Sequence, residues 1–328
     1  MKMSGANASP TRSASAIARS LKQGRSHQIM LIALIAVMIA CSGSLFAQWP
    51  KFKEAGAPRD EQDRVLMDGR MPRTPDGKPD LSGDWVRADR DPLPQELAGV
   101  VTARGETNRS VPVERPAPPF PPDPNSPPLA TFFDLGANVS GGLPFMPSAA
   151  ELKKNRMATN DKDNPDANCM PMGITQFHMQ PQPRKIVQTP NLIVILYEAN
   201  YGVRYIYTDG RSLPPQGEPQ PWWYGYSAGR WEGDTLVVET NNLRGAESGP
   251  FDGWLDVRGS PYSEQARFIE RFRRPIFGKL EIDITVDDPK SYTKPFTVRI
   301  NQRFMADEEP MEFICNENQQ FRRRIKVD

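Results

Sequence analysis

The sequence predicts a mainly β protein, an antiparallel β-barrel or sandwich with one short helix and an irregular, proline-rich N-terminal extension. The clearest observation is the segment 280–287, in which Leu, Ile or Val alternates with acidic residues or Thr. Because side chains of a strand point alternately to opposite faces, this segment has one apolar and one polar face. Similar short segments follow one another from Lys185 to Glu317, which is typical of barrels and sandwiches.

The pattern places each expected element in turn. We expect strands at residues 185–189, 192–199, 203–208, 223–230, 234–241, 265–274, 279–287, 295–305 and 310–316. Turn residues join two pairs of these strands, Glu232-Gly233-Asp234 in one case and Pro275-Ile276-Phe277-Gly278 in the other. A helix is predicted over 147–160, with Ser148 as the cap and Glu151 three residues later.

The first 47 residues have the composition of a secretory signal peptide. They contain basic but no acidic residues, and an apolar run of twelve residues spans Ile29–Ala40. This run is too short to cross a bilayer, which takes roughly twenty residues. We expect cleavage after Ala47 and a periplasmic or secreted protein. The alternatives are a lipoprotein anchored through Cys41 and an uncleaved anchor.

The rest of the chain divides at residue 147. Residues 48–146 form the irregular extension, in which the stretch 111–128 contains nine prolines and favours an extended conformation. Residues 147–328 form the β domain. Without residues 1–47 the net charge is about −4, so there is no basic excess to attract nucleic acid. No further transmembrane span is expected, and the oligomeric state is left open.

Two cysteines remain after removal of the signal peptide, Cys169 and Cys315. An even pair in an oxidising compartment predicts a disulfide. It would tie the loop before the barrel strands to the last strand, and closing so long a loop stabilises the fold by about 3–5 kcal/mol. The alternative is a pair of buried free thiols.

Several strings of residues resemble a large family of exported bacterial proteins of unknown function. They include TPDGKPDLSGDW at Thr74–Trp85, KIVQTPNLIVILYE at Lys185–Glu198, GRWEGDTLVVET at Gly229–Thr240 and ICNEN at Ile314–Asn318. The resemblance implies export and a β-rich domain, and no activity. Gly83-Asp84-Trp85 also resembles the Gly-x-Trp pattern that opens the first strand of calycin-type barrels.

Aromatic residues suggest where a ligand binds. Rings at a barrel mouth suit sugars, phenolics or other partly apolar molecules, which they bind by stacking. The leading hypothesis is therefore a periplasmic protein that binds a small or oligomeric organic ligand, such as an oligosaccharide or phenolic compound, in a barrel pocket. The expected ligand-binding residues are Tyr197, Arg204, Trp222, Trp223, Tyr224, Tyr226 and His178. Some of these rings are equally compatible with a purely structural role in the core.

Two rival functions remain. The first is an enzyme without cofactor, a lyase, isomerase or hydrolase in which Glu198 and Tyr205 serve as acid–base groups. The second is a scaffold or interaction protein of the cell envelope. Soft ligands for copper are present in Cys169, Met170, Met172, His178 and Met179, but their spacing matches no metal motif, so no metal site is predicted. No cofactor is expected, since nucleotide-binding and zinc-protease motifs are absent from the sequence.

Overall fold

The computed structural model describes residues 52–89, 120 and 123–315. They belong to a compact unit that begins at Phe52. The expected signal peptide with its cut after Ala47, the alternative lipid attachment at Cys41 and most of the proline-rich stretch lie outside the described residues.

The described residues form nine strands and a few short helices. The strands are β1 (Gly83–Arg87), β2 (Arg184–Gln188), β3 (Leu192–Tyr197), β4 (Val203–Tyr207), β5 (Tyr226–Glu232), β6 (Thr235–Asn241), β7 (Arg267–Ile276), β8 (Lys279–Asp287) and β9 (Phe296–Phe304). The helices are α3 (Pro147–Ala158) and α4 (Ile174–Met179), with 3-10 turns η1 (Asp166–Asn168) and η2 (Ala199–Tyr201).

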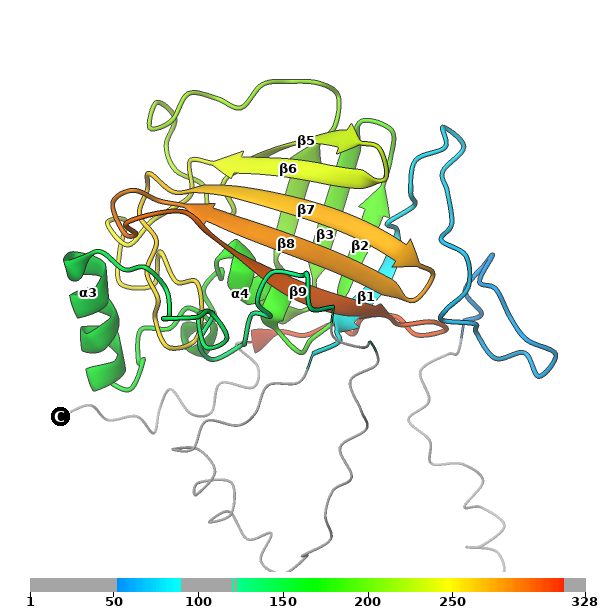
Figure 1. Ribbon diagram of the computed structural model, residues 1–328, viewed down its shortest axis with the longest axis horizontal. Coiled ribbons are helices and arrows are strands. Elements are labelled where there is room, and N and C mark those ends of the chain that lie inside the picture. The colour runs from blue at the N-terminus through cyan, green and yellow to red at the C-terminus, as the bar shows by residue number, and fades with distance from the viewer. Residues whose placement is uncertain (1–51, 90–119, 121–122, 316–328) are drawn as a thin grey trace, which may run out of the picture. The chain divides into compact units, whose positions relative to one another are not determined.

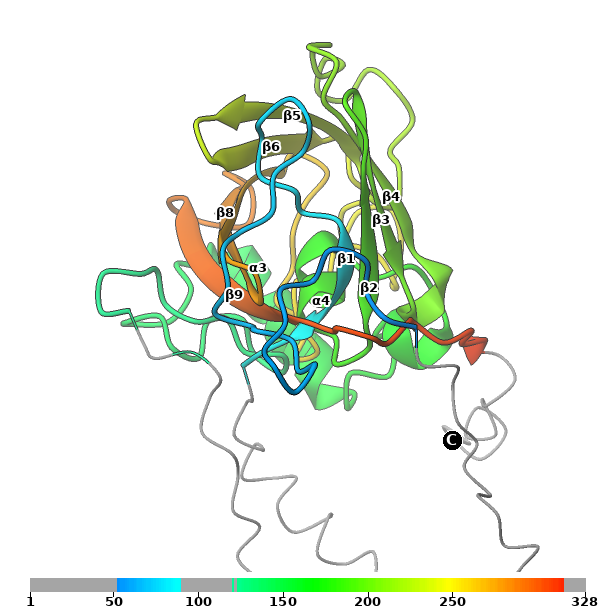
Figure 2. The same cartoon turned by 90° about the vertical axis from the view of Figure 1, so that its right-hand side faces the viewer.

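The strands close into one barrel in chain order, as Figures 1 and 2 show. β1 pairs with β2 on one side and with β9 on the other, which completes the ring. A barrel is therefore confirmed, but it is mixed rather than purely antiparallel because β4 and β5 run parallel. Parallel neighbours need a long connection, and residues 208–225 provide it. β1 lies within the range assigned to the extension, so the barrel uses residues on both sides of position 147.

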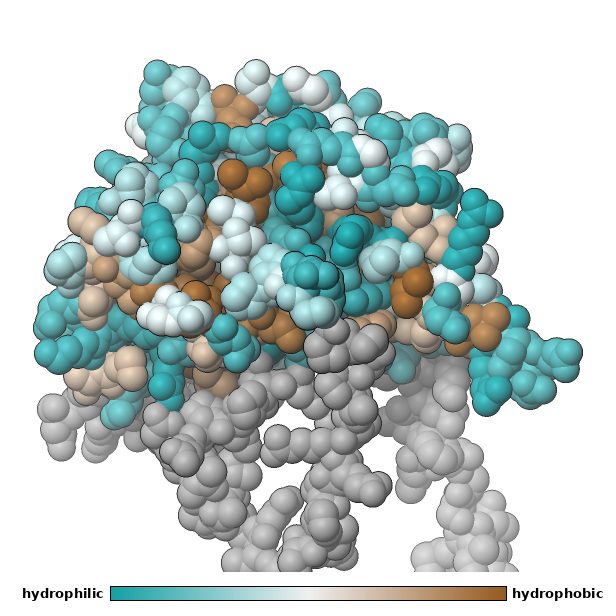
Figure 3. Space-filling model, in the orientation of Figure 1, coloured by the Kyte–Doolittle hydropathy of each residue, from teal (hydrophilic) through white to brown (hydrophobic). Residues whose placement is uncertain are grey.

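Alternation along the strands fills the barrel with side chains. In β8, Leu280, Ile282, Ile284 and Val286 are each no more than 1% exposed and belong to the core. The outward residues of β5 to β8 instead carry charges that pair across strands, such as Arg230 with Glu239. The face in Figure 3 is accordingly largely hydrophilic, with smaller hydrophobic areas between the polar side chains.

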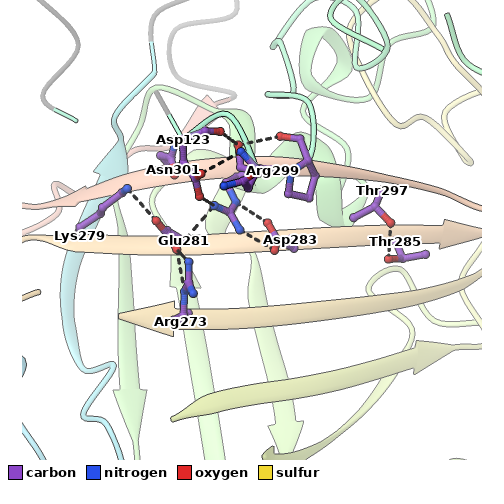
Figure 4. Close-up of polar contacts among 12 residues, drawn as sticks. Asp123, Arg273, Lys279, Glu281, Asp283, Thr285, Thr297, Arg299 and Asn301 are labelled. Carbon is purple, nitrogen blue, oxygen red and sulfur yellow. Dashed lines mark hydrogen bonds and ion pairs between the residues drawn. The ribbon is translucent and has the colours of Figure 1, made fainter. Parts of the chain in front are cut away.

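The chain that leads out of the proline-rich stretch pairs with the edge of β9, beyond the end of β1. The amide of Arg299 donates to the carbonyl of Pro128 at 2.9 Å, and the amide of Ala130 donates to the carbonyl of Arg299 at 2.8 Å. The Arg299 side chain meets Asp283 at 2.5 Å and lies 3.7 Å from Asp123 (Figure 4). This contact holds the described end of the extension on the barrel wall.

The helices match the prediction in part. α3 lies where a helix was expected, but Met146 rather than Ser148 precedes it and no side chain caps it, because Pro147 already provides the first helical residue. α4 was not predicted. Its six residues are all buried, and it lies near one end of the ring of strands in Figures 1 and 2.

The predicted disulfide between Cys169 and Cys315 is confirmed. Its placement differs in one respect, because residues 310–315 form no strand. The bond therefore joins the loop that precedes α4 to the segment that follows β9.

Candidate functional site

The barrel interior contains a cluster of charged side chains from three different elements. α4 contributes His178, β4 contributes Arg204 and β7 contributes Glu270, and the three are at most 2% exposed. His178 Nε2 lies 3.0 Å from Glu270 Oε1, and Arg204 Nη1 donates to the same oxygen at 2.9 Å. A second Arg204 nitrogen donates to Glu270 Oε2, so the arginine holds the carboxylate with two bonds.

Two further strands complete the surroundings of Arg204. Its Nη2 donates to Thr240 Oγ1 of β6 at 2.9 Å and to Ser227 Oγ of β5 at 3.1 Å. The hydroxyls of Ser227 and Thr240 are themselves 2.8 Å apart. A buried guanidinium with these partners has a fixed position, because any rotation would leave a donor unpaired in a dry interior.

The protonation states follow from the same contacts. Burial raises the pKa of Glu270, but the charge of Arg204 and the hydrogen bonds from His178 and Arg204 outweigh it, and the pKa is about 2. Burial lowers the pKa of His178 despite the opposing effect of Glu270. Ionised Glu270 can only accept, so the neutral imidazole donates through Nε2 and its Nδ1 carries a lone pair.

Among the buried polar atoms of this region, two on adjoining rings lack an acceptor or a donor that would complete them, and Nε of Arg184 and Oε1 of Gln302 are also unpaired. The two on adjoining rings are Nδ1 of His178 and the hydroxyl oxygen of Tyr197, a residue of β3. The two rings adjoin each other, with centroids 5.8 Å apart. Burial raises the pKa of Tyr197 to about 12, so its hydroxyl keeps its proton.

Aromatic side chains enclose these two groups. Phe177 stacks on Tyr197 with a centroid distance of 4.4 Å, and Phe272 packs edge-on against His178 at 5.8 Å. Tyr224, half-buried in the long loop before β5, contacts Phe177 at 5.3 Å. The rings of Tyr224 and Phe177 therefore separate the polar cluster from the surface at this side of the barrel.

A second buried arginine fixes the helix that carries His178. Arg184 of β2 donates to the carbonyls of His178, Gln180 and Gln182 at 2.6 to 2.8 Å. Gln302 of β9 also donates to the His178 carbonyl, at 3.2 Å. These bonds satisfy carbonyls at the C-terminus of α4, which is how so short a helix keeps its place.

The residues predicted to bind a ligand divide between the inside and the outside of the barrel. Tyr197, Arg204, His178 and Tyr224 belong to the interior group. Trp222 is 42% exposed and tilts against Tyr226 at 5.6 Å, while Trp223 packs against Arg244 at 4.5 Å. These three lie apart from the interior group.

The two residues predicted to be catalytic also lie outside the interior. Tyr205 is 52% exposed, because it neighbours inward-facing Arg204 and so points outward. Glu198 follows β3 and accepts a hydrogen bond from the Met311 amide at 2.8 Å, and burial raises its pKa. Glu270 was missed. Its signal was its place between Phe268 and Phe272, two positions that share one face of β7.

Other features of the described residues lie away from this cluster. A cavity of about 530 Å³ is bordered by Phe132, Met157 and Arg258, near α3, and one of about 210 Å³ by Lys78 and Trp231. Among the described residues, no three His, Cys, Asp or Glu side chains gather as a metal site would require.

No helix in the described part of the chain has the length and apolarity of a membrane span. Comparison with known proteins found no matching family description, no matching curated protein and no matching solved structure.

Proposed function

We propose that this chain is an exported protein that binds a small organic ligand inside its barrel, against His178 and Tyr197. The observation that supports this most strongly is the pair of unpaired polar atoms on these two buried residues. Buried polar groups in native proteins are nearly always hydrogen-bonded, and exceptions mark a bound water, a ligand or a catalytic role. The two rings adjoin, so we assign both atoms to one ligand site.

The hydrogen-bonding character of His178 Nδ1 and of the Tyr197 hydroxyl indicates which groups the ligand carries. His178 Nδ1 accepts a hydrogen bond, so the ligand offers a hydroxyl or N–H group to it, and the Tyr197 hydroxyl donates to a ligand oxygen. The rings of Phe177, Phe272 and Tyr224 favour a flat aromatic or conjugated molecule. The charges of Glu270 and Arg204 balance each other, and the second buried arginine, Arg184, is bonded to three backbone carbonyls, so we propose a neutral ligand rather than an ion.

Access to the interior requires a movement of Tyr224. This ring is half-buried and belongs to the loop 208–225, whereas the walls of the barrel are hydrogen-bonded strands. Turning Tyr224 outward uncovers Phe177, which stacks on Tyr197. Because side chains fill the barrel, the space for the ligand comes from the displacement of these two rings. Loops move more readily than the strands they connect, so we place the entrance here.

Export and family membership are part of the same proposal. The basic, acid-free N-terminal segment and the strings shared with exported bacterial proteins favour export. The bonded pair Cys169–Cys315 is compatible with it, because disulfides form and persist in oxidising compartments.

The binding experiment uses a panel of neutral phenols, 4-ethylphenol and vanillin among them, titrated calorimetrically into the purified protein. Tyr197→Phe removes the hydroxyl proton that the ligand is proposed to accept, and Arg204 keeps its bonds to Glu270, so the fold is retained and affinity falls about three- to tenfold. Tyr207→Phe is the matched control, because Tyr207 lies on the outer face of β4, stacked on Tyr226; it leaves affinity unchanged.

The variant Trp222→Ala tests the alternative surface outside the barrel. Loss of binding in this variant, together with normal binding by Tyr197→Phe, would move the site to the exposed aromatic residues. No binding of any phenol by the wild-type protein would refute the interior site for this class of ligand and favour a scaffold.

A further inference from the structure

We propose that His178 is a general base that removes a proton from carbon in the bound molecule, with Tyr197 hydrogen-bonded to the oxygen that gains negative charge. This inference rests on the binding site proposed above and adds an activity to it. The substrate class is a neutral, conjugated or aromatic carbonyl compound with an acidic C–H bond, and the reaction is an isomerisation.

The contacts of His178 match what a general base requires. A base needs a free lone pair, and Nδ1 has one because Nε2 donates to ionised Glu270 at 3.0 Å. The carboxylate fixes the tautomer and stabilises the imidazolium that forms when Nδ1 takes a proton. Glu270 is thus a positioning residue, and Arg204 keeps it in place and ionised through paired hydrogen bonds.

Tyr197 supplies the complementary group. Its hydroxyl is protonated and neighbours Arg204, which can only donate, so the hydroxyl proton has no acceptor in the protein and is available to a substrate oxygen. A donor fixed in an apolar, water-poor site stabilises developing negative charge more strongly than water does. A base on one ring and a donor on the adjoining ring form the pair that enolisation needs.

The step balances without an oxidant or reductant. The C–H electron pair forms a carbon–carbon double bond, the carbonyl electrons move to oxygen, and the proton passes to His178 Nδ1. Tyr197 stabilises the enolate oxygen, and His178 then returns the same proton to a different carbon. The imidazolium lasts only between these two transfers and lies beside Glu270, which offsets its charge.

The test uses 5-nitrobenzisoxazole, an activated carbon acid whose ring opens when a base removes its C–H proton. The C–H electrons form a nitrile, the N–O bond breaks, and the oxygen leaves as a coloured phenolate. Wild-type protein is expected to accelerate this opening, and the His178→Gln variant is expected to open the ring at least tenfold more slowly than wild type. The Gln amide can still donate to Glu270, so the variant keeps the internal bond. The rate of ring opening falls a few-fold in Tyr197→Phe and is unchanged in Tyr207→Phe.

The pH dependence of the rate distinguishes a general base from a residue that only stabilises the fold. The groups around His178 are Glu270 of β7, Arg204 of β4, Arg184 of β2 and Tyr197 of β3. Because the pKa of His178 lies below its ordinary 6.5, the rate is flat at neutral pH and falls only under acid conditions. Glu270→Gln, where it folds, moves that acid limb to lower pH, since Glu270 favours the protonated ring.

Binding is measured separately with 5-nitroindazole, an unreactive bicycle of similar shape. Binding of this compound without faster ring opening than in His178→Gln refutes the general base and leaves the binding site standing. Failure of 5-nitroindazole and all the phenols to bind refutes the site itself. If His178→Gln does not fold, a wild-type rate that rises steadily through pH 6.5 to 9 contradicts the assignment, because a more basic group would then be acting.

Discussion

The substitution Glu270→Leu tests whether the interior cluster is a dry, paired unit. It removes a carboxylate that is fully buried and leaves Arg204, at most 2% exposed, without its counter-charge. Breaking one partner of a buried ion pair costs about 3–5 kcal/mol, because the remaining charge stays desolvated. We expect a loss of that size in the free energy of unfolding, measured by urea denaturation and circular dichroism.

Two controls separate the pairing from other effects. Glu232→Gln breaks two exposed pairs, with Arg271 at 3.1 Å and with Arg230 at 3.0 Å, and each exposed pair contributes less than about 1 kcal/mol. The double variant Arg204→Met/Glu270→Leu removes both charges and recovers most of the loss, since apolar replacements of a buried pair are often neutral. A loss below about 1 kcal/mol in Glu270→Leu would refute the reasoning, because Arg204 would then have to be hydrated.

Two other predictions concern the disulfide and acid stability. Replacing both Cys169 and Cys315 by Ser opens a loop of 146 residues and is expected to cost about 3–5 kcal/mol in urea denaturation; wild-type protein treated with a reductant should match the variant, and a difference between the two would count against the bond. Glu270 has a folded pKa of about 2 against an ordinary 4.5, so its stabilising effect is complete above pH 4.5 and is lost as pH falls toward 2. The stability gap between wild type and Glu270→Gln should therefore narrow over this range, and a gap that stays constant would contradict the low pKa.

The sequence predicted the barrel well because alternation is a local signal. The strand expected at 279–287 is β8 with the same bounds, and the strand expected at 295–305 is β9, one residue shorter at each end. The parallel pairing of β4 with β5 could not be predicted, because strand order depends on where the loop 208–225 returns and not on the pattern within either strand. The expected strand at 310–316 failed because residues near Cys315 are held by a crosslink rather than by a sheet.

The candidate site was predicted less completely. His178, Arg204 and Tyr197 were named, but their partner Glu270 was assigned no role because charged residues surround it in the sequence. Its position between two inward phenylalanines would have identified it. α4 was missed because six residues are too few to show a helical pattern, and its stability comes from contacts with Arg184 rather than from its own sequence.

The bonds that Arg204 makes to neighbouring strands affect the register in which the barrel closes. β4 and β5 share two residue pairs, a much shorter ladder than the eight pairs between β8 and β9. The backbone hydrogen bonds of so short a ladder do little to specify one register over another. A shift of the register by one residue would turn the Arg204 side chain toward solvent. The buried carboxylate of Glu270 would then have no counter-charge. Where β4 meets β5, the register of the barrel is thus fixed by the ionic and hydroxyl groups in its interior.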